Sequence, residues 1–484
     1  MSKVRDLKDF NWGYILYKII EIVQTNFYIV KIMFWIYSLL GGLKMGKPKL
    51  KKEIGLFTAT ALVVGNMMGS GIFMLPASLA GVSGPGSTIL AWLLTGLGSL
   101  VLALTFANLG SKIPKTGGTY EYSRLAYGNF MGFMTAWLYW NGSWIGNATI
   151  FIVITTYLGE VITSLTNSPI TGFLFCTSIL WICTYINIRG TKLAGRVTSV
   201  ITVFKVLLFI VFIVVGLIYF DPSNLTPMFP EGKGISTVPV AASLTLWAFM
   251  GLETASVAGG EIKDPEKNVK RSTILGMLIS TVLYILISVV AMGAMSQSEL
   301  ASSTAPISDI IVKVLNLKSL NFLNIAIAIS ILGTAMGWLL STARVGYAAG
   351  EDGIFPSVFA KVHPKYNTPH VALIIGSIFI NIIFLMNFTK GLAGAYSFIV
   401  VLATLSYLPI YAISTIAEII LMIRDDEKPT FRKYLGLIIR CLIGFAFAIW
   451  AIYASGSEIV MYGFILILLG VPIYGYMSIK KHFR

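Results

Sequence analysis

After Lys52, apolar residues run in stretches of about 20, and short polar segments separate these stretches. A helix of about 20 apolar residues is long enough to cross a lipid bilayer. We therefore predict an all-α polytopic membrane protein with twelve transmembrane helices. The predicted spans cover residues 55–80, 87–109, 131–159, 170–188, 197–219, 239–260, 273–296, 319–344, 369–388, 392–423, 434–455 and 457–478.

The composition agrees with this pattern. The 484 residues are 56% hydrophobic and 12% charged, with a mean hydropathy of +0.81. Such values are typical of a protein whose solvent is the lipid bilayer, and they argue against a soluble protein.

The net charge of +15 would suit a nucleic-acid-binding protein, but the basic residues gather in alternate connections between the predicted spans. The connections on the opposite side carry only Lys233, Lys313, Lys318 and Lys390. Cytoplasmic loops of membrane proteins are enriched in lysine and arginine, so both termini are expected in the cytoplasm. We expect the lipid bilayer as a partner and no nucleic acid.

The first predicted span contains a glycine-rich break at residues 65–72. Broken helix in a membrane is tolerated only where it is buried in protein or lines a cavity. The amides of Gly69, Ser70 and Gly71 would then begin a half-helix and offer a site for an anion. A second apolar run breaks at residues 246–256, and two broken helices in matching halves indicate the substrate site of a secondary transporter. The alternative is a small-residue motif for helix packing.

Two charged residues lie deep within predicted spans. Glu253 is the only acid deep in the sixth span, and Lys205 lies nine residues into the fifth. A charge at the centre of a bilayer is costly, so such residues are functional by default. The alternatives are a polar strut between helices for Glu253 and snorkelling toward the cytoplasm for Lys205.

Little in the chain indicates other chemistry. The three cysteines lie within predicted spans, and neither a metal-ligand spacing nor a nucleophile–base pair is present. We expect no metal, no cofactor and no enzymatic activity.

Residues 1–44 differ from the rest, because their apolar stretch carries Lys18, Glu21 and Lys31. This N-terminal extension could lie in the membrane interface. Alternatively, translation begins at Met45, in which case the extension would be dispensable. Residues 45–484 are expected to form one transporter domain.

Several motifs, in this order along the chain, resemble the amino acid–polyamine–organocation (APC) superfamily, and most closely its basic amino acid/polyamine antiporter branch. That branch includes the arginine–agmatine and ornithine–putrescine antiporters. The motifs lie at residues 65–72, 114–122, 138–147, 246–256, 263–269, 337–338 and 351–356. The resemblance implies a 5+5 inverted repeat (LeuT/APC fold) with broken helices 1 and 6. Repeat one would span about 54–220, repeat two about 238–423, and two extra helices about 434–478.

The resemblance also implies a substrate site. Its carboxylate-binding residues would be Gly69, Ser70 and Gly71. Its amine would bind carbonyl groups near Met67, Trp247 and Met250. The side-chain pocket and its aromatic gates would be formed by Tyr139, Trp144, Asn147, Trp247 and Trp338, because aromatic faces attract cations.

For coupling, the resemblance implicates Glu253 in binding substrate or protons. Proton-coupled transporters of the superfamily carry a lysine at the place of Lys205, where sodium-coupled relatives bind the ion. The Lys205 side chain would then lie near Ser330 and Thr334 of the eighth span. The tenth span departs from the arginine exchangers, because residues 398–401 are apolar where those proteins offer serine.

We therefore expect a secondary active transporter in the bacterial inner membrane. Its substrates would be cationic amino acids (arginine, ornithine or lysine) or a polyamine, moved by exchange or with protons. A homodimer is possible. The alternatives are a proton-coupled permease for neutral amino acids and, from another class, a channel.

Overall fold

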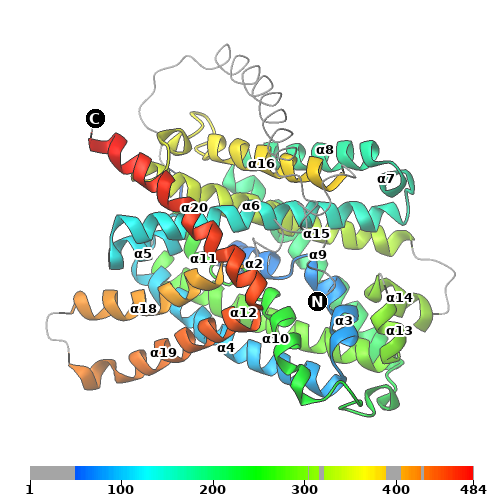
Figure 1. Ribbon diagram of the computed structural model, residues 1–484. Helices are drawn as coiled ribbons and strands as arrows, with labels where there is room; N and C mark the ends of the chain where they lie inside the picture. The colour runs from blue at the N-terminus through cyan, green and yellow to red at the C-terminus, as the bar shows by residue number, and fades with distance from the viewer. Residues whose placement is uncertain (1–49, 304, 316–320, 389–404, 427–429, 483–484) are drawn as a thin grey trace, which may run out of the picture. The chain divides into compact units, whose positions relative to one another are not determined.

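A computed structural model of the protein describes residues 50–303, 305–315, 321–388, 405–426 and 430–482 (Figure 1). The described residues form helices joined by turns and contain no β-strand. Their only β-type contact is an isolated parallel bridge between Ile54 and Ile262. The predicted all-α class is confirmed for this part of the chain, whereas the expectations for residues 1–44 lie outside it.

The first half of the described chain contains α2 (Leu56–Met67), α3 (Gly71–Val82), α4 (Pro85–Lys112), α5 (Thr119–Tyr127), α6 (Asn129–Gly159), α7 (Ser164–Asn167), α8 (Pro169–Ile188) and α9 (Thr191–Ile218). The connection that follows holds the short 3₁₀ helices η1 (Pro222–Leu225) and η2 (Ile235–Thr237).

The second half contains α10 (Val238–Trp247), α11 (Thr254–Val257), η3 (Gly259–Glu261), α12 (Pro265–Ala294), α13 (Gln297–Ser302), α14 (Pro306–Val314), α15 (Asn321–Glu351), η4 (Ser357–Ala360) and α16 (His370–Phe388). It ends with α18 (Leu408–Arg424), α19 (Phe431–Ala454) and α20 (Ser457–His482).

Among the described residues, nine helical segments are long and apolar enough to cross a membrane. They are Leu56–Val82, Pro85–Lys112, Pro169–Ile188, Thr191–Ile218, Pro265–Ala294, Asn321–Glu351, His370–Phe388, Phe431–Ala454 and Val460–Ile479. The other three predicted spans fall on α6, on the shorter apolar helix Ile235–Trp247 with its continuation, and on a segment that is partly outside the described residues. The count of twelve and the inverted repeat stay predictions.

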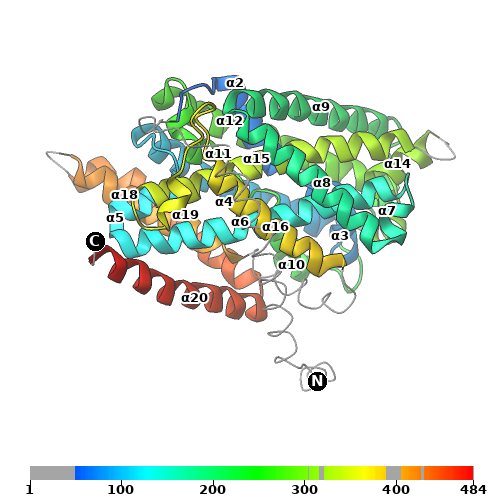
Figure 2. The same ribbon diagram turned by 90° about the horizontal axis from the view of Figure 1, so that it is seen from above.

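The long helices lie side by side, as both views of the ribbon show (Figures 1 and 2). Helix α15 contacts α2, α6, α9 and α16, and α12 contacts α2, α4 and α9. Small residues allow some of these helices to approach closely. A side chain at Gly276 of α12, for example, would lie within 2.4 Å of Val63 in α2.

The first span is interrupted where the sequence predicts it, because α2 ends at Met67 and α3 begins at Gly71. The sixth predicted span is interrupted between the end of α10 at Trp247 and the start of α11 at Thr254. The two interruptions touch. Gly251 has a φ of +102°, and a Cβ atom at this position would lie 3.1 Å from Asn66 Cβ. Only glycine combines this backbone conformation with so close an approach.

Candidate substrate site between two broken helices

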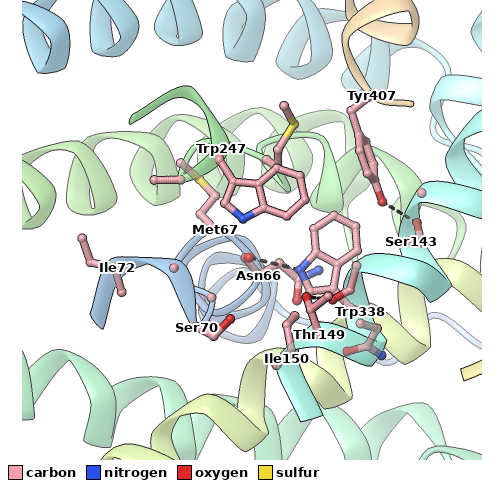
Figure 3. Close-up of a pocket in the computed structure, with 17 residues that line it drawn as sticks. Asn66, Met67, Ser70, Ile72, Ser143, Thr149, Ile150, Trp247, Trp338 and Tyr407 are labelled. Carbon is pink, nitrogen blue, oxygen red and sulfur yellow. Dashed lines mark hydrogen bonds between the residues drawn. The ribbon is translucent and has the colours of Figure 1, made fainter. Parts of the chain in front are cut away.

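A cavity lies beside the two helix interruptions (Figure 3). Helices α2, α3, α6, α10 and α15 contribute to its wall, together with the segment that follows α10 and with Tyr407. The described lining residues are Asn66, Met67, Gly69, Ser70, Gly71, Ile72, Gly142, Ser143, Gly146, Asn147, Thr149, Ile150, Trp247, Ala248, Met250, Trp338 and Tyr407. The cavity therefore brings together most of the residues that the sequence analysis selected.

The start of α3 faces this cavity. Ser70 is the N-cap residue, and its side chain makes no capping hydrogen bond. The first amides of a helix have no acceptor within the helix, so Ser70 and Gly71 present donors to the cavity. The Gly69 amide is already used, because it donates to Met67 O at 2.8 Å. An anion at this place would also be stabilised by the positive end of the α3 dipole.

The predicted carbonyl acceptors have room for further hydrogen bonds. Met67 O accepts from the Gly69 amide, and Trp247 O accepts from the Met250 amide at 3.2 Å. A carbonyl oxygen has two lone pairs, so each of these groups can accept a second hydrogen. The carbonyls therefore suit the ammonium group of an amino acid.

The predicted aromatic residues divide into two groups. Trp247 and Trp338 line the cavity, whereas Tyr139 and Trp144 do not. Trp144 packs against Phe379 with a ring-centroid distance of 5.1 Å, and Tyr139 packs edge-on against Tyr407 at 5.3 Å. In this conformation Tyr139 supports Tyr407 of the cavity wall, whereas Trp144 packs against a residue outside the wall, so the roles of both as substrate contacts stay predictions.

Asn147 also lines the cavity, on the same helix α6 as Ser143. Its amide nitrogen donates to Ala335 O at 3.1 Å, whereas its side-chain oxygen has no partner among the described residues. The oxygen is thus an acceptor held in place by the hydrogen bond of the nitrogen.

Glu253 is fully buried directly before α11, outside the described lining of the cavity. Its Oε2 accepts a hydrogen bond of 2.7 Å from the Tyr411 hydroxyl, and its Oε1 has no partner among the described residues. Glu253 therefore joins the interrupted sixth span to α18. A polar strut would show the same hydrogen bond, so coupling by Glu253 stays a prediction.

Lys205 points into the protein and is fully buried. Its Nζ donates to Met68 O at 2.5 Å and to Thr334 Oγ1 at 2.6 Å. The ammonium thus lies between the interruption of the first span and α15, where the sequence analysis expected it, and it does not snorkel. The Ser330 hydroxyl donates to Ile327 O, and among the described residues Lys205 Nζ binds Met68 O and Thr334 Oγ1 instead.

The chain also matches known proteins. Residues 54–473 match the family model described as amino acid permease. The chain belongs to the amino acid permease family, within the APC superfamily.

Relatives in several bacteria match over most of their length. A putative arginine/ornithine antiporter of Bacillus subtilis is 31% identical, with 89% of this chain and 98% of the relative covered. The putrescine transporter PotE of Escherichia coli is also 31% identical, with 90% and 98% covered. An arginine/ornithine antiporter of Pseudomonas aeruginosa is 28% identical, with 87% and 90% covered.

Members of the amino acid permease family are transporters and not enzymes, so this membership confirms that the chain is a membrane transporter. Among the described residues, no group of histidine, cysteine and acidic side chains could hold a metal ion.

The sequence analysis of this permease missed Asn66 and Tyr407 as lining residues and Tyr411 as the partner of Glu253. Asn66 belongs to the glycine-rich motif, and its polarity in an apolar span was a usable signal. The two tyrosines gave no such signal, since aromatic residues are common near the ends of membrane spans.

Proposed function

We propose that the protein transports cationic amino acids or a polyamine across the bacterial inner membrane, by exchange or with protons. The observation that carries the proposal is the cavity between the two interruptions, which has amide donors at the start of α3 and the indole rings of Trp247 and Trp338 in its wall. The relatives include a putative arginine/ornithine antiporter and a putrescine transporter, which supports the same substrate class.

In this proposal, the substrate carboxylate binds at Gly69, Ser70 and Gly71. Ser70 and Gly71 donate their amides, and Gly69, which has no side chain, lets the carboxylate come close to the backbone. The α-ammonium binds the carbonyls of Met67, Trp247 and Met250. Both sites would use backbone groups freed by broken helices, as in transporters built from inverted repeats.

The cationic side chain would lie against the faces of Trp247 and Trp338. Attraction between a cation and an aromatic face is worth about 0.5–2 kcal/mol, and more of this is realised where water is excluded. Tyr139, Trp144 and Asn147 complete the proposed side-chain pocket and gates, with Tyr139 and Trp144 acting in another conformation of the cycle.

For coupling, we propose that Lys205 and Glu253 each bind and release a proton during the transport cycle. The Lys205 ammonium fills the space between Met68 O and Thr334 Oγ1. Loss of its proton would remove the positive charge that strengthens its hydrogen bonds to these two oxygens, and this weakening favours rearrangement of α2 and α3 against α15. No sodium ion is required.

The alternation of basic connections supports an orientation with both termini in the cytoplasm. A homodimer stays a prediction from the resemblance.

Counterflow in proteoliposomes tests the proposal. Vesicles loaded with an unlabelled compound would be exposed to labelled arginine, ornithine, lysine, putrescine, leucine or glutamate. We expect saturable uptake of at least one cationic compound and little uptake of leucine or glutamate. Strong leucine transport without competition from any cationic compound would support the neutral permease instead, and uptake that does not saturate would indicate a channel.

A further inference from the structure

The polar groups of the cavity fall into two sets, according to whether their hydrogens are free to bind a ligand or already bind protein acceptors. Figure 3 shows Ser70 on one side of the two indoles and the Ser143–Tyr407 pair on the other. The first side carries the amides of α3. Among the described lining residues, the polar side chains of the second side, Ser143, Asn147, Thr149 and Tyr407, have their hydrogens bound to protein acceptors.

The Ser143–Tyr407 pair has a defined direction. Ser143 Oγ donates to Tyr139 O at 2.6 Å and lies 2.6 Å from Tyr407 Oη. A hydroxyl has one hydrogen, so while Ser143 donates to Tyr139 O the second contact uses the hydrogen of Tyr407. Both hydrogens are thus occupied, and Tyr407 Oη can offer only lone pairs to a ligand.

The neighbouring residues of α6 show the same arrangement. Thr149 Oγ1 donates to Gly146 O at 2.6 Å, and Asn147 Nδ2 donates to Ala335 O at 3.1 Å. Asn147 Oδ1, on a side chain that is 1% exposed, has no partner among the described residues. These two side chains therefore add acceptors to the same wall.

Asn66 lines the cavity too, but its side-chain oxygen lies against Gly337 of α15, where an added Cβ would be 2.0 Å away. Trp338 Nε1 donates to Asn66 O at 3.2 Å, so the indole donor is used. Asn66 Nδ2 donates to Thr254 Oγ1 at 3.0 Å and to Ser341 Oγ at 3.2 Å, which occupies both amide hydrogens. Asn66 Oδ1 is left without a partner among the described residues.

We propose that Tyr407, with Ser143 as its positioning residue, determines specificity by presenting an acceptor-only wall to the end of the substrate side chain. The substrate class is then an α-amino acid whose side chain ends in an ammonium or guanidinium group. This inference rests on the proposed function and restricts its substrates to cationic α-amino acids.

Two classes of compound fit this cavity less well. A leucine side chain cannot donate to the wall, so the buried acceptors stay unpaired, and such sites reject analogues that lack the donor. A diamine such as putrescine can donate to the wall, but it brings no carboxylate to the amides of Ser70 and Gly71. We therefore expect ornithine to bind more tightly than both leucine and putrescine.

The test is equilibrium binding of labelled ornithine to the purified full-length protein, with arginine, leucine and putrescine as competitors. Tyr407→Phe removes the acceptor and should weaken ornithine binding by about 10- to 100-fold, the range for a hydrogen bond to a charged group. Leucine affinity should stay the same or increase. The matched control is Tyr127→Phe, which also removes a tyrosine hydroxyl bonded to a carbonyl, Ile413 O at 3.1 Å, on a residue outside the cavity lining.

Ser143→Ala separates positioning from simple packing. This variant frees the Tyr407 hydrogen to turn toward the ligand, so the ratio of ornithine to leucine affinity should fall. In the Tyr407→Phe background the same change should not alter that ratio further. If Tyr407→Phe does not fold, the ratio of ornithine to leucine affinity in Ser143→Ala alone tests whether Tyr407 determines specificity.

An unchanged affinity ratio in the folded single variants would overturn the role of Tyr407 while leaving the proposed function intact. Putrescine that competes as well as ornithine against the wild type would overturn the restriction to amino acids. A wild-type protein that binds leucine and no cationic compound would instead refute the proposed function.

Discussion

The carboxylate of Glu261 and the guanidinium of Arg344 form a fully buried ion pair between η3 and α15. Glu261 Oε2 also accepts from Thr191 Oγ1 at 2.7 Å, at the first residue of α9. The backbone carbonyl of Glu261 accepts from the amides of Glu53 and Ile54, each at 3.0 Å. Glu261 thus ties the start of the first span, the end of the sixth, the fifth and the eighth together.

We predict that Glu261→Ala strongly destabilises the junction of these four segments. Removing one partner of a buried ion pair leaves an uncompensated charge and costs roughly 3–5 kcal/mol. Thermal unfolding of the detergent-solubilised protein, together with the accessibility of a cysteine placed at Thr191, would measure the loss. The control is Glu299→Ala, whose partner Lys313 is 2.7 Å away in an exposed pair worth at most about 1 kcal/mol. Equal effects of the two substitutions would contradict the role of Glu261.

Lys205→Ala should slow proton-driven uptake and reduce its dependence on pH, while substrate binding changes little. The reason is that the ammonium binds Met68 O and Thr334 Oγ1 but does not line the cavity. Uptake between pH 5 and 8, with and without sodium, provides the measurement. Lys192→Ala, an exposed lysine on the same helix, is the control. Wild-type behaviour of Lys205→Ala at every pH would favour pure exchange.

Trp338→Leu should weaken binding of cationic substrates by roughly 0.5–2 kcal/mol, the range of a cation–π interaction. Trp338 also donates to Asn66 O, so Trp338→Phe, which keeps an aromatic face but loses that hydrogen bond, separates the two contributions. Trp450→Leu, on α19 and outside the cavity lining, controls for the loss of an indole. A cationic substrate that binds Trp338→Leu as tightly as wild type would exclude the aromatic contact.

Gly251→Ala should impair transport by separating the two helix interruptions. Its φ of +102° is strained for any residue with a side chain, at a cost of about 1–3 kcal/mol, and the new Cβ would crowd Asn66. Gly475→Ala is the matched control, because a Cβ atom there would meet nothing within 4 Å. Ornithine binding and thermal stability would both be measured. If Gly251→Ala changes neither ornithine binding nor thermal stability, the close approach of Gly251 to Asn66 is not required for function.

The sequence could predict features that depend on one segment at a time. Span lengths follow from the thickness of the bilayer, and the glycines at residues 65–72 mark an interruption because helix is weakened there. Lys205 and Glu253 could be recognised as candidate functional residues because a charge within an apolar span is energetically costly. These inferences required no knowledge of which helices are neighbours.

Tertiary structure decided which residues face each other. Helical periodicity places Tyr139, Ser143 and Asn147 on one face of α6, but it does not say that Tyr407, 264 residues after Ser143, would bind that face. Nor could the periodicity show that Trp144 packs against Phe379. In a chain that is apolar almost throughout, hydrophobicity does not specify helix partners. Close packing of small residues and hydrogen bonds between helices specify them, and these become visible only once the helices are assembled.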